Sequence, residues 1–141
     1  MTKLNKTTNH GSCLCGKICF QVTEFLPLVG HCHCTMCRKF HGAAFSTYAE
    51  VKRQDVHWLS GEELLSSYRA DNGTVRKFCQ NCGTSLLFES QYNRRDNTIE
   101  IAIATFDNIE HVTPSAHIYI GSKVDWLTIN DELPQFLAYR K

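Results

Sequence analysis

The sequence lacks any long apolar run and any excess of charge of one sign. No stretch approaches the roughly 18 consecutive apolar residues of a transmembrane helix, and the first ten residues, MTKLNKTTNH, lack the apolar segment of a secretory signal. Lys and Arg total 15 against 14 Asp and Glu, for a formal net charge of +1, which offers little attraction to nucleic acid or anionic lipid. We therefore expect a cytoplasmic protein with no membrane and no nucleic-acid partner.

The chain also lacks internal repeats, low-complexity tracts and linkers. Its 141 residues are 43% hydrophobic and 21% charged, which suits one globular domain of ordinary size. We expect this single domain to cover residues 11–141. The polar residues 1–10 should form a frayed N-terminus.

Alternating residue patterns predict a mainly β fold. In TIEIAIATF, residues 98–106, isoleucines alternate with Glu and Ala, as in a half-buried strand. Asn72 and Gly73 stand between two β-prone runs and predict a hairpin. Further strands are expected in AFSTYAEV, DVHWLS, TSLLFES and AHIYIGS. No long period of 3.6 residues is present, so helix should be confined to a turn near TMCRKFH and another near the C-terminus.

Cysteine, by contrast, is abundant. Eight cysteines fall into three groups along the chain: Cys13, Cys15 and Cys19; Cys32, Cys34 and Cys37; and Cys79 and Cys82. Because the cytoplasm keeps thiols reduced, they are better interpreted as metal ligands than as disulfides.

Two of these groups predict a closed zinc site. FCQNCG places Cys79 and Cys82 in a Cys-x-x-Cys turn followed by a glycine, the pattern of a zinc knuckle. The knuckle supplies half of a tetrahedral site, and the glycine-flanked GSCLCG offers Cys13 and Cys15 as the other half. We therefore predict one structural zinc ion with four cysteine ligands.

The segment CHCTMC predicts a second, open zinc site. Cys32, Cys34 and Cys37 supply three thiolates within one turn, and three protein ligands with one vacancy are typical of a catalytic or ligand-exchanging zinc. These three cysteines are our candidate catalytic residues, and the ion they hold is expected to be labile. The alternative is that a fourth protein ligand closes this site.

Four residues are candidates for that fourth ligand: Cys19, His31, His33 and His41. In an extended backbone the His33 side chain points away from the cysteines on either side of it. His41 follows Cys37 by four residues and shares a face with it if a helical turn begins there. Cys19 lies in a strand whose core-facing positions are Ile18, Phe20 and Val22, so we expect an ordinary strand residue. The remaining histidines, His10, His57, His111 and His117, show no ligand spacing.

The charge of the open site bears on its chemistry. Three thiolates around one divalent ion leave a net negative charge, which makes the zinc a weak Lewis acid. Such an ion suits thiolate binding better than water activation. Arg38 and Lys39 follow directly and would either offset this charge, hold an anionic ligand, or form a solvated basic pair.

The motifs resemble a known family. GSCLCGKICFQV, CHCTMCRKFHGAAF, FCQNCGTSLLF and SKVDWLTINDELPQF are similar to successive motifs of the glutathione-dependent formaldehyde-activating enzyme (GFA) family, which includes centromere protein V. The resemblance covers about Gly11 to Phe136. It departs from the family pattern in VDW, where a proline-containing segment is expected, and at Cys19, a position often held by arginine.

The resemblance implies a fold and a function. The fold is a zinc-stabilised β-tent of several coiled antiparallel sheets with minimal helix, holding the same two zinc ions. The activity is that of a carbon-sulfur lyase joining glutathione, or a related thiol, to formaldehyde as S-hydroxymethylglutathione. Two alternatives stay open: a small-thiol binding protein without turnover, and a structural zinc module for interaction with other molecules.

Overall fold

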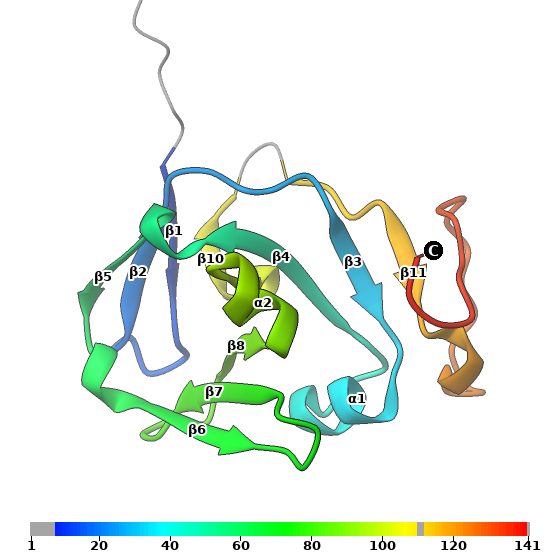
Figure 1. Ribbon diagram of the computed structural model, residues 1–141, viewed down its shortest axis with the longest axis horizontal. Coiled ribbons are helices and arrows are strands. Elements are labelled where there is room, and N and C mark those ends of the chain that lie inside the picture. Colours follow the sequence, from blue (N-terminus) through cyan, green and yellow to red (C-terminus); the bar gives the residue numbers. More distant parts are fainter. Residues whose placement is uncertain (1–7, 110–111, 141) are drawn as a thin grey trace, which may run out of the picture.

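The fold consists of two β-sheets and two short helices. The structure, a computed structural model, describes residues 8–109 and 112–140. A four-stranded sheet has the order β10-β1-β2-β5, and a seven-stranded sheet has the order β11-β3-β4-β9-β8-β7-β6. Figure 1 shows the smaller sheet on the left and the C-terminal segment beside β11 on the right.

The elements have the following bounds. The smaller sheet contains β1 (Asn9–Ser12), β2 (Cys19–Val22), β5 (Val56–Ser60) and β10 (Phe106–Asn108). The larger sheet contains β3 (Val29–Cys32), β4 (Ser46–Lys52), β6 (Leu65–Arg69), β7 (Val75–Cys79), β8 (Ser85–Glu89), β9 (Thr98–Ala102) and β11 (Ala116–Ile118). The α-helices are α1 (Thr35–His41) and α2 (Gln91–Asp96). Every strand pair is antiparallel except β11 with β3.

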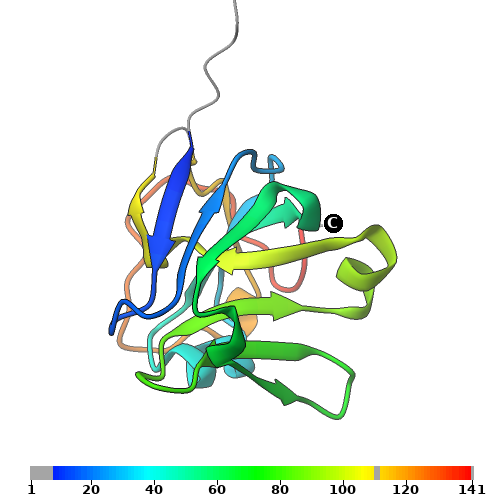
Figure 2. The same ribbon diagram turned by 90° about the vertical axis from the view of Figure 1, so that its left-hand side faces the viewer.

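Short 3₁₀ turns stand at three of the points where the chain changes sheet. Arg53–Asp55 joins β4 to β5, Glu62–Leu64 joins β5 to β6, and Ile103–Thr105 joins β9 to β10. Each of these turns leads from a strand of one sheet to a strand of the other, so the two sheets are held against a shared core. In Figure 2 the blue N-terminal strands accordingly stand at a steep angle to the green strands β6 and β7.

The main core lies between the sheets. Phe20 and Val22 of the smaller sheet meet Val51, Leu86 and Ile101 of the larger one, and all five are fully buried. Phe20 also packs against Trp58 and Phe106, with ring centroids 5.4 and 5.3 Å away. The predicted inward phase of Ile18, Phe20 and Val22 is confirmed, because all three have 0% exposure.

The mainly β class is confirmed, and each expected strand is present at least in part. Of AHIYIGS only Ala116–Ile118 is a strand, because Tyr119 has a φ of 58° and the 3₁₀ turn Ile120–Ser122 follows. The strand expected over residues 98–106 is broken by the turn Ile103–Thr105, where the chain leaves one sheet for the other. The predicted hairpin at Asn72 and Gly73 joins β6 to β7. The expected frayed segment is too long, because Asn9 and His10 belong to β1; residues 1–7 lie outside the described part of the chain.

The helices differ in part from expectation. The predicted turn near TMCRKFH is helix α1. The part of the C-terminus that the structure describes contains the 3₁₀ turn Ile120–Ser122 and no α-helix. Helix α2 was not predicted; Ser90 caps it in a capping box with Asn93, and Asn97 ends it with a φ of 58°.

Two carboxylates lie side by side in the larger sheet. Glu50 of β4 is directly opposite Glu100 of β9. Glu50 accepts hydrogen bonds from the Thr98 hydroxyl at 2.6 Å and from the Asn93 amide at 3.4 Å. Burial, together with the Glu50 charge, raises the pKa of Glu100 to about 7. Folding therefore favours the protonated Glu100.

Glu100→Gln should stabilise the protein in a pH-dependent way. Because the folded-state pKa is raised, the stability that Glu100 contributes is present below its ordinary pKa of 4.5 and lost as pH rises through about 7. Replacing it should raise the unfolding free energy at about pH 8 by up to ~3 kcal/mol, and by far less at about pH 5. Urea unfolding of the variant and of the exposed control Glu62→Gln measures this; an equal effect at both pH values would contradict it.

Candidate metal sites

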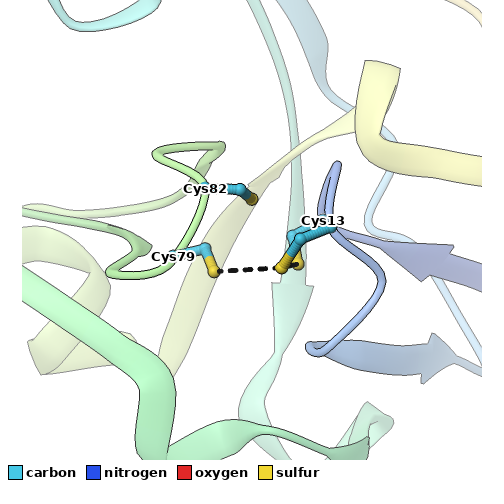
Figure 3. A group of neighbouring side chains, drawn as sticks. Cys13, Cys79 and Cys82 are labelled. Carbon is cyan, nitrogen blue, oxygen red and sulfur yellow. Dashed lines mark hydrogen bonds between the residues drawn. The ribbon is translucent and has the colours of Figure 1, made fainter.

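The first candidate site gathers four cysteines from two distant turns. Cys13 and Cys15 lie between β1 and β2, whereas Cys79 ends β7 and Cys82 lies before β8. Their sulfur atoms all lie within 4.8 Å of one another, with 3.5 Å between Cys13 and Cys15 and 4.0 Å between Cys15 and Cys79. Figure 3 shows Cys79 and Cys82 facing Cys13 across the gap between the two turns.

The backbone of both turns is built to point sulfur inward. Gly16 has a φ of 80° and its N–H donates to the Cys13 carbonyl, and Gly83 has a φ of 84° and donates to the Cys79 carbonyl. Only glycine adopts such a conformation without strain. The Thr84 hydroxyl connects the turns, since it accepts from the Leu14 N–H at 2.9 Å and lies 3.1 Å from the Cys82 sulfur.

The chemistry of these four sulfurs fits a metal ion. All are free thiols, and their spacing is far from the roughly 2.05 Å of a disulfide. Sulfurs around a tetrahedral zinc, with bonds of about 2.3 Å, stand about 3.8 Å apart, close to the separations found. The Thr84 hydroxyl lowers the pKa of Cys82 to about 5, and burial raises the pKa of Cys13 to about 11. A cation is what would allow all four thiolates to form together.

The second candidate site, called the cup below, consists of Cys32, Cys34 and Cys37. Cys32 ends β3, Cys34 is the N-cap of α1, and Cys37 lies in its first turn, with its N–H donating to the Cys34 sulfur at 3.3 Å. The three sulfurs lie within 4.8 Å of one another, and in the described ranges no other Cys, His, Asp or Glu joins them. Cys32 and Cys37 are buried and Cys34 is half-buried, so the approach from solvent is on the side of Cys34.

One thiol of the cup is much more acidic than the others. Hydrogen bonds from Cys32 and Cys37 lower the pKa of Cys34 to about 2, with a further contribution from the Cys37 N–H. The hydrogen bond to Cys34 is also the largest cause that raises the pKa of Cys32. Cys34 is therefore the first thiolate of the cup, and the other two need a cation to ionise beside it.

Arg76 contacts the cup, which sequence reasoning did not predict. Its Nη1 donates to the Cys37 sulfur at 3.7 Å, and its side chain is 4% exposed. The guanidinium lies over the rings of Phe40 and Phe88, 5.5 and 5.0 Å from their centroids. The buried cation at the cup is thus this residue of β7, and neither the Arg38 nor the Lys39 side chain has a described contact with the three sulfurs.

The histidines considered as a fourth ligand of the cup form hydrogen bonds with other residues. His33 is fully buried and its Nε2 lies 2.8 Å from Nδ1 of His117, so it faces away from the cup as predicted. His41 hydrogen-bonds to the Tyr48 hydroxyl at 2.8 Å. Burial lowers the pKa of His41 to about 4. Cys19 donates to the Gly16 carbonyl at 3.3 Å and belongs to neither cysteine cluster.

Comparison with known proteins identifies the family of the chain. The sequence profile of the family described as "glutathione-dependent formaldehyde-activating enzyme" matches residues 8–122. The chain belongs to this GFA family. The match spans both cysteine clusters, so the predicted family is confirmed; the motif SKVDWLTINDELPQF, residues 122–136, lies almost wholly beyond the matched range.

Two curated relatives and one solved structure extend the comparison. An uncharacterized lyase of Schizosaccharomyces pombe is 31% identical over 116 residues, which cover 82% of this chain and 81% of the relative. A putative glutathione-dependent formaldehyde-activating enzyme of Halomonas elongata is 27% identical over 127 residues, covering 85% and 80%. A crystal structure of a Rhodobacter sphaeroides protein has a TM-score of 0.59 at 23% identity, covering 72% of this chain and 91% of that one, and supports the fold alone.

No helix within residues 8–109 and 112–140 is long and apolar enough to cross a membrane.

The two cysteine clusters of this GFA-family chain should respond differently to mutation. Cys13 and Cys79 belong to the main core between the sheets, and Cys82 packs against it. Cys32 and Cys37 of the cup belong to a smaller cluster with Tyr48 and Ala102. Structural zinc contributes about 10–16 kcal/mol of apparent free energy, as much as the net stability of a domain. Cys82→Ser should therefore abolish cooperative unfolding, while Cys34→Ser should release one ion and keep the fold. Thermal melts with metal counts measure both; equal damage would mean that the cup is a structural site.

Arg76→Met should weaken metal binding at the cup. The substitution keeps the apolar bulk between the two phenylalanine rings but removes the charge beside Cys37. Outer partners of metal ligands typically contribute about 10- to 100-fold in affinity, so zinc should leave the cup at correspondingly lower chelator concentration. Arg95→Met, at an exposed arginine that pairs with Asp96, is the matched control. Identical chelator competition curves for the two variants would rule out this role of Arg76.

Proposed function

We propose that the protein is a zinc-dependent lyase of the carbon-sulfur class that acts on glutathione, or a related small thiol, and an aldehyde. The observation that carries this proposal is the incomplete cup: three thiols within 4.8 Å, with no further Cys, His, Asp or Glu of the described residues beside them. The family match and the names of two relatives, a lyase and a formaldehyde-activating enzyme, support the same class. We further propose one zinc in each cysteine cluster and a cytoplasmic location, which fits eight free thiols.

The residues at the cup would have different roles in this reaction. A zinc ion held by Cys32, Cys34 and Cys37 would accept a soft thiolate as its remaining ligand and keep it deprotonated at neutral pH. Arg76 offsets part of the negative charge of the cysteines. The half-buried Cys34 marks the open side from which a peptide thiol can approach.

The proposed reaction joins the substrate sulfur to the aldehyde carbon. A carbon-sulfur bond forms, the carbonyl π bond breaks, and the proton lost by the thiol finally resides on the former carbonyl oxygen. No oxidant or reductant is consumed. Because the uncatalysed addition is already facile, holding the sulfur toward the aldehyde accounts for much of the expected acceleration.

Exchange kinetics test the proposal directly. Magnetisation-transfer NMR measures the interconversion of formaldehyde and glutathione with S-hydroxymethylglutathione, in the absence and presence of zinc-loaded protein. We expect acceleration of about tenfold or more with the wild type and none with Cys34→Ser. Cys19→Ser is the matched control, because Cys19 belongs to neither cluster, and it should keep wild-type rates.

The two alternatives give different results in the same experiment. If the kinetics are unchanged but calorimetry shows saturable glutathione binding, the protein binds thiols without catalysing the reaction. If the kinetics are unchanged and glutathione does not bind, both metal sites serve the fold. The protein would then be a structural zinc module, the role suggested by the predicted relation to centromere protein V.

A further inference from the structure

A third group of ligand-type side chains lies outside both cysteine clusters. It consists of His31 on β3, His117 on β11 and Asp131 in the C-terminal segment, whose ligand atoms all lie within 4.8 Å of one another. His31 and His117 are directly opposite in the parallel pair of β3 and β11. The C-terminal segment passes alongside this strand pair (Figure 1) and brings the Asp131 carboxylate to 2.9 Å from His117 Nε2.

This group occupies the face of the sheet opposite the cup. Successive side chains of a strand point to opposite faces, so His31 and Cys32 face away from each other. The imidazole rings lie together: the centroid of His117 is 4.7 Å from that of His31 and 5.1 Å from that of His33. Phe45 packs against both His31 and His33. The histidine face is therefore spatially separate from the three cysteines.

Each of the three side chains is oriented by a second polar contact. His31 Nδ1 lies 2.7 Å from the Thr47 hydroxyl, so Nε2 is the nitrogen that would bind an ion. His117 Nδ1 lies 2.8 Å from His33 Nε2. Asp131 Oδ1 accepts from the Leu133 N–H at 3.1 Å and also lies 3.1 Å from His117 Nε2, whereas Oδ2 contacts His117 Nε2 alone, at 2.9 Å. Metal-binding side chains commonly have such a partner on the atom that does not bind the metal.

The buried His33 is a second, independent observation. Its side chain is fully buried, yet Nδ1 has no hydrogen-bond partner. The His33 ring therefore makes one hydrogen bond, between its Nε2 and His117 Nδ1. This bond fixes the orientation of the His117 ring. A buried residue used in this way is expected behind a ligand rather than in an ordinary surface ion pair.

We propose that His31, His117 and Asp131 form a third metal site, for zinc or a similar divalent transition ion. Two imidazole nitrogens and one carboxylate oxygen are a common ligand set for such ions. Around zinc, nitrogen and oxygen ligands stand about 3.4 Å apart, so the exposed Asp131 needs to retreat only slightly from His117. Metal on His117 Nε2 leaves Nδ1 protonated to donate to His33. The ion would fasten the C-terminal segment to β3 and β11.

Metal counting on matched variants tests this site. Protein equilibrated with excess zinc by dialysis should retain one ion fewer per chain in Asp131→Asn than in the wild type. Asparagine preserves the acceptor for Leu133 but is a poor zinc ligand. Asp125→Asn, at another exposed aspartate of the same segment, is the control and should match the wild type.

Cobalt substitution separates this site from the cysteine clusters. Thiolate-bound cobalt gives intense sulfur-to-metal charge-transfer absorption, whereas the proposed site has no sulfur. The ion lost in Asp131→Asn should therefore leave that absorption unchanged. His31→Phe, which keeps a ring of similar size, should show the same loss, with His57→Phe as its control. Equal metal counts in wild type, Asp131→Asn and His31→Phe would overturn the proposal, as would a loss accompanied by weaker charge-transfer absorption.

Discussion

The structure depends on the meeting of four thiols where the two sheets join. Cys13 and Cys79 are buried in the main core, where an uncompensated thiolate is costly. Their turns belong to different sheets and lie more than sixty positions apart in sequence. A metal ion at this point would neutralise the thiolates and link the two sheets. This explains why each turn contains a glycine with positive φ, which directs the sulfur atoms inward.

The cup differs from this junction in how its ligands are supplied. One continuous segment, from the end of β3 into α1, provides all three sulfurs, so they do not connect distant parts of the chain. The strand end and the helix N-cap set their positions, and Arg76 arrives from β7 to balance the charge. A site with local ligands can lose its ion without separating the sheets, and an ion with an unfilled position is available to a substrate.

Sequence reasoning recovered what depends on local spacing. The individual cysteine motifs, the strand phase of Ile18, Phe20 and Val22, and helix α1 follow from neighbouring residues. The union of Cys13 and Cys15 with Cys79 and Cys82 followed from ligand number, because a tetrahedral ion needs four ligands and each motif offers two. Sequence reasoning failed where distant segments decide the outcome. Arg76 reaches the cup only through the pairing of β7 with β8, and His117 meets His31 only because β11 pairs with β3 in parallel. The turn Ile103–Thr105 is likewise invisible in an alternating pattern, since it marks a change of sheet. Helix α2 did carry a local signal, Ser90 with Asn97, but its six residues are too short to show a period.

The central claim is that the cup keeps one coordination position for an exchangeable thiol. Cadmium NMR of the cadmium-loaded protein tests it most directly, because the chemical shift of the metal reports how many sulfurs surround it. The account predicts two sulfur-rich signals, of which one keeps its shift when glutathione is added while the other moves toward four-sulfur coordination. Two signals that both correspond to four sulfurs before glutathione is added, and that do not respond to it, would contradict it.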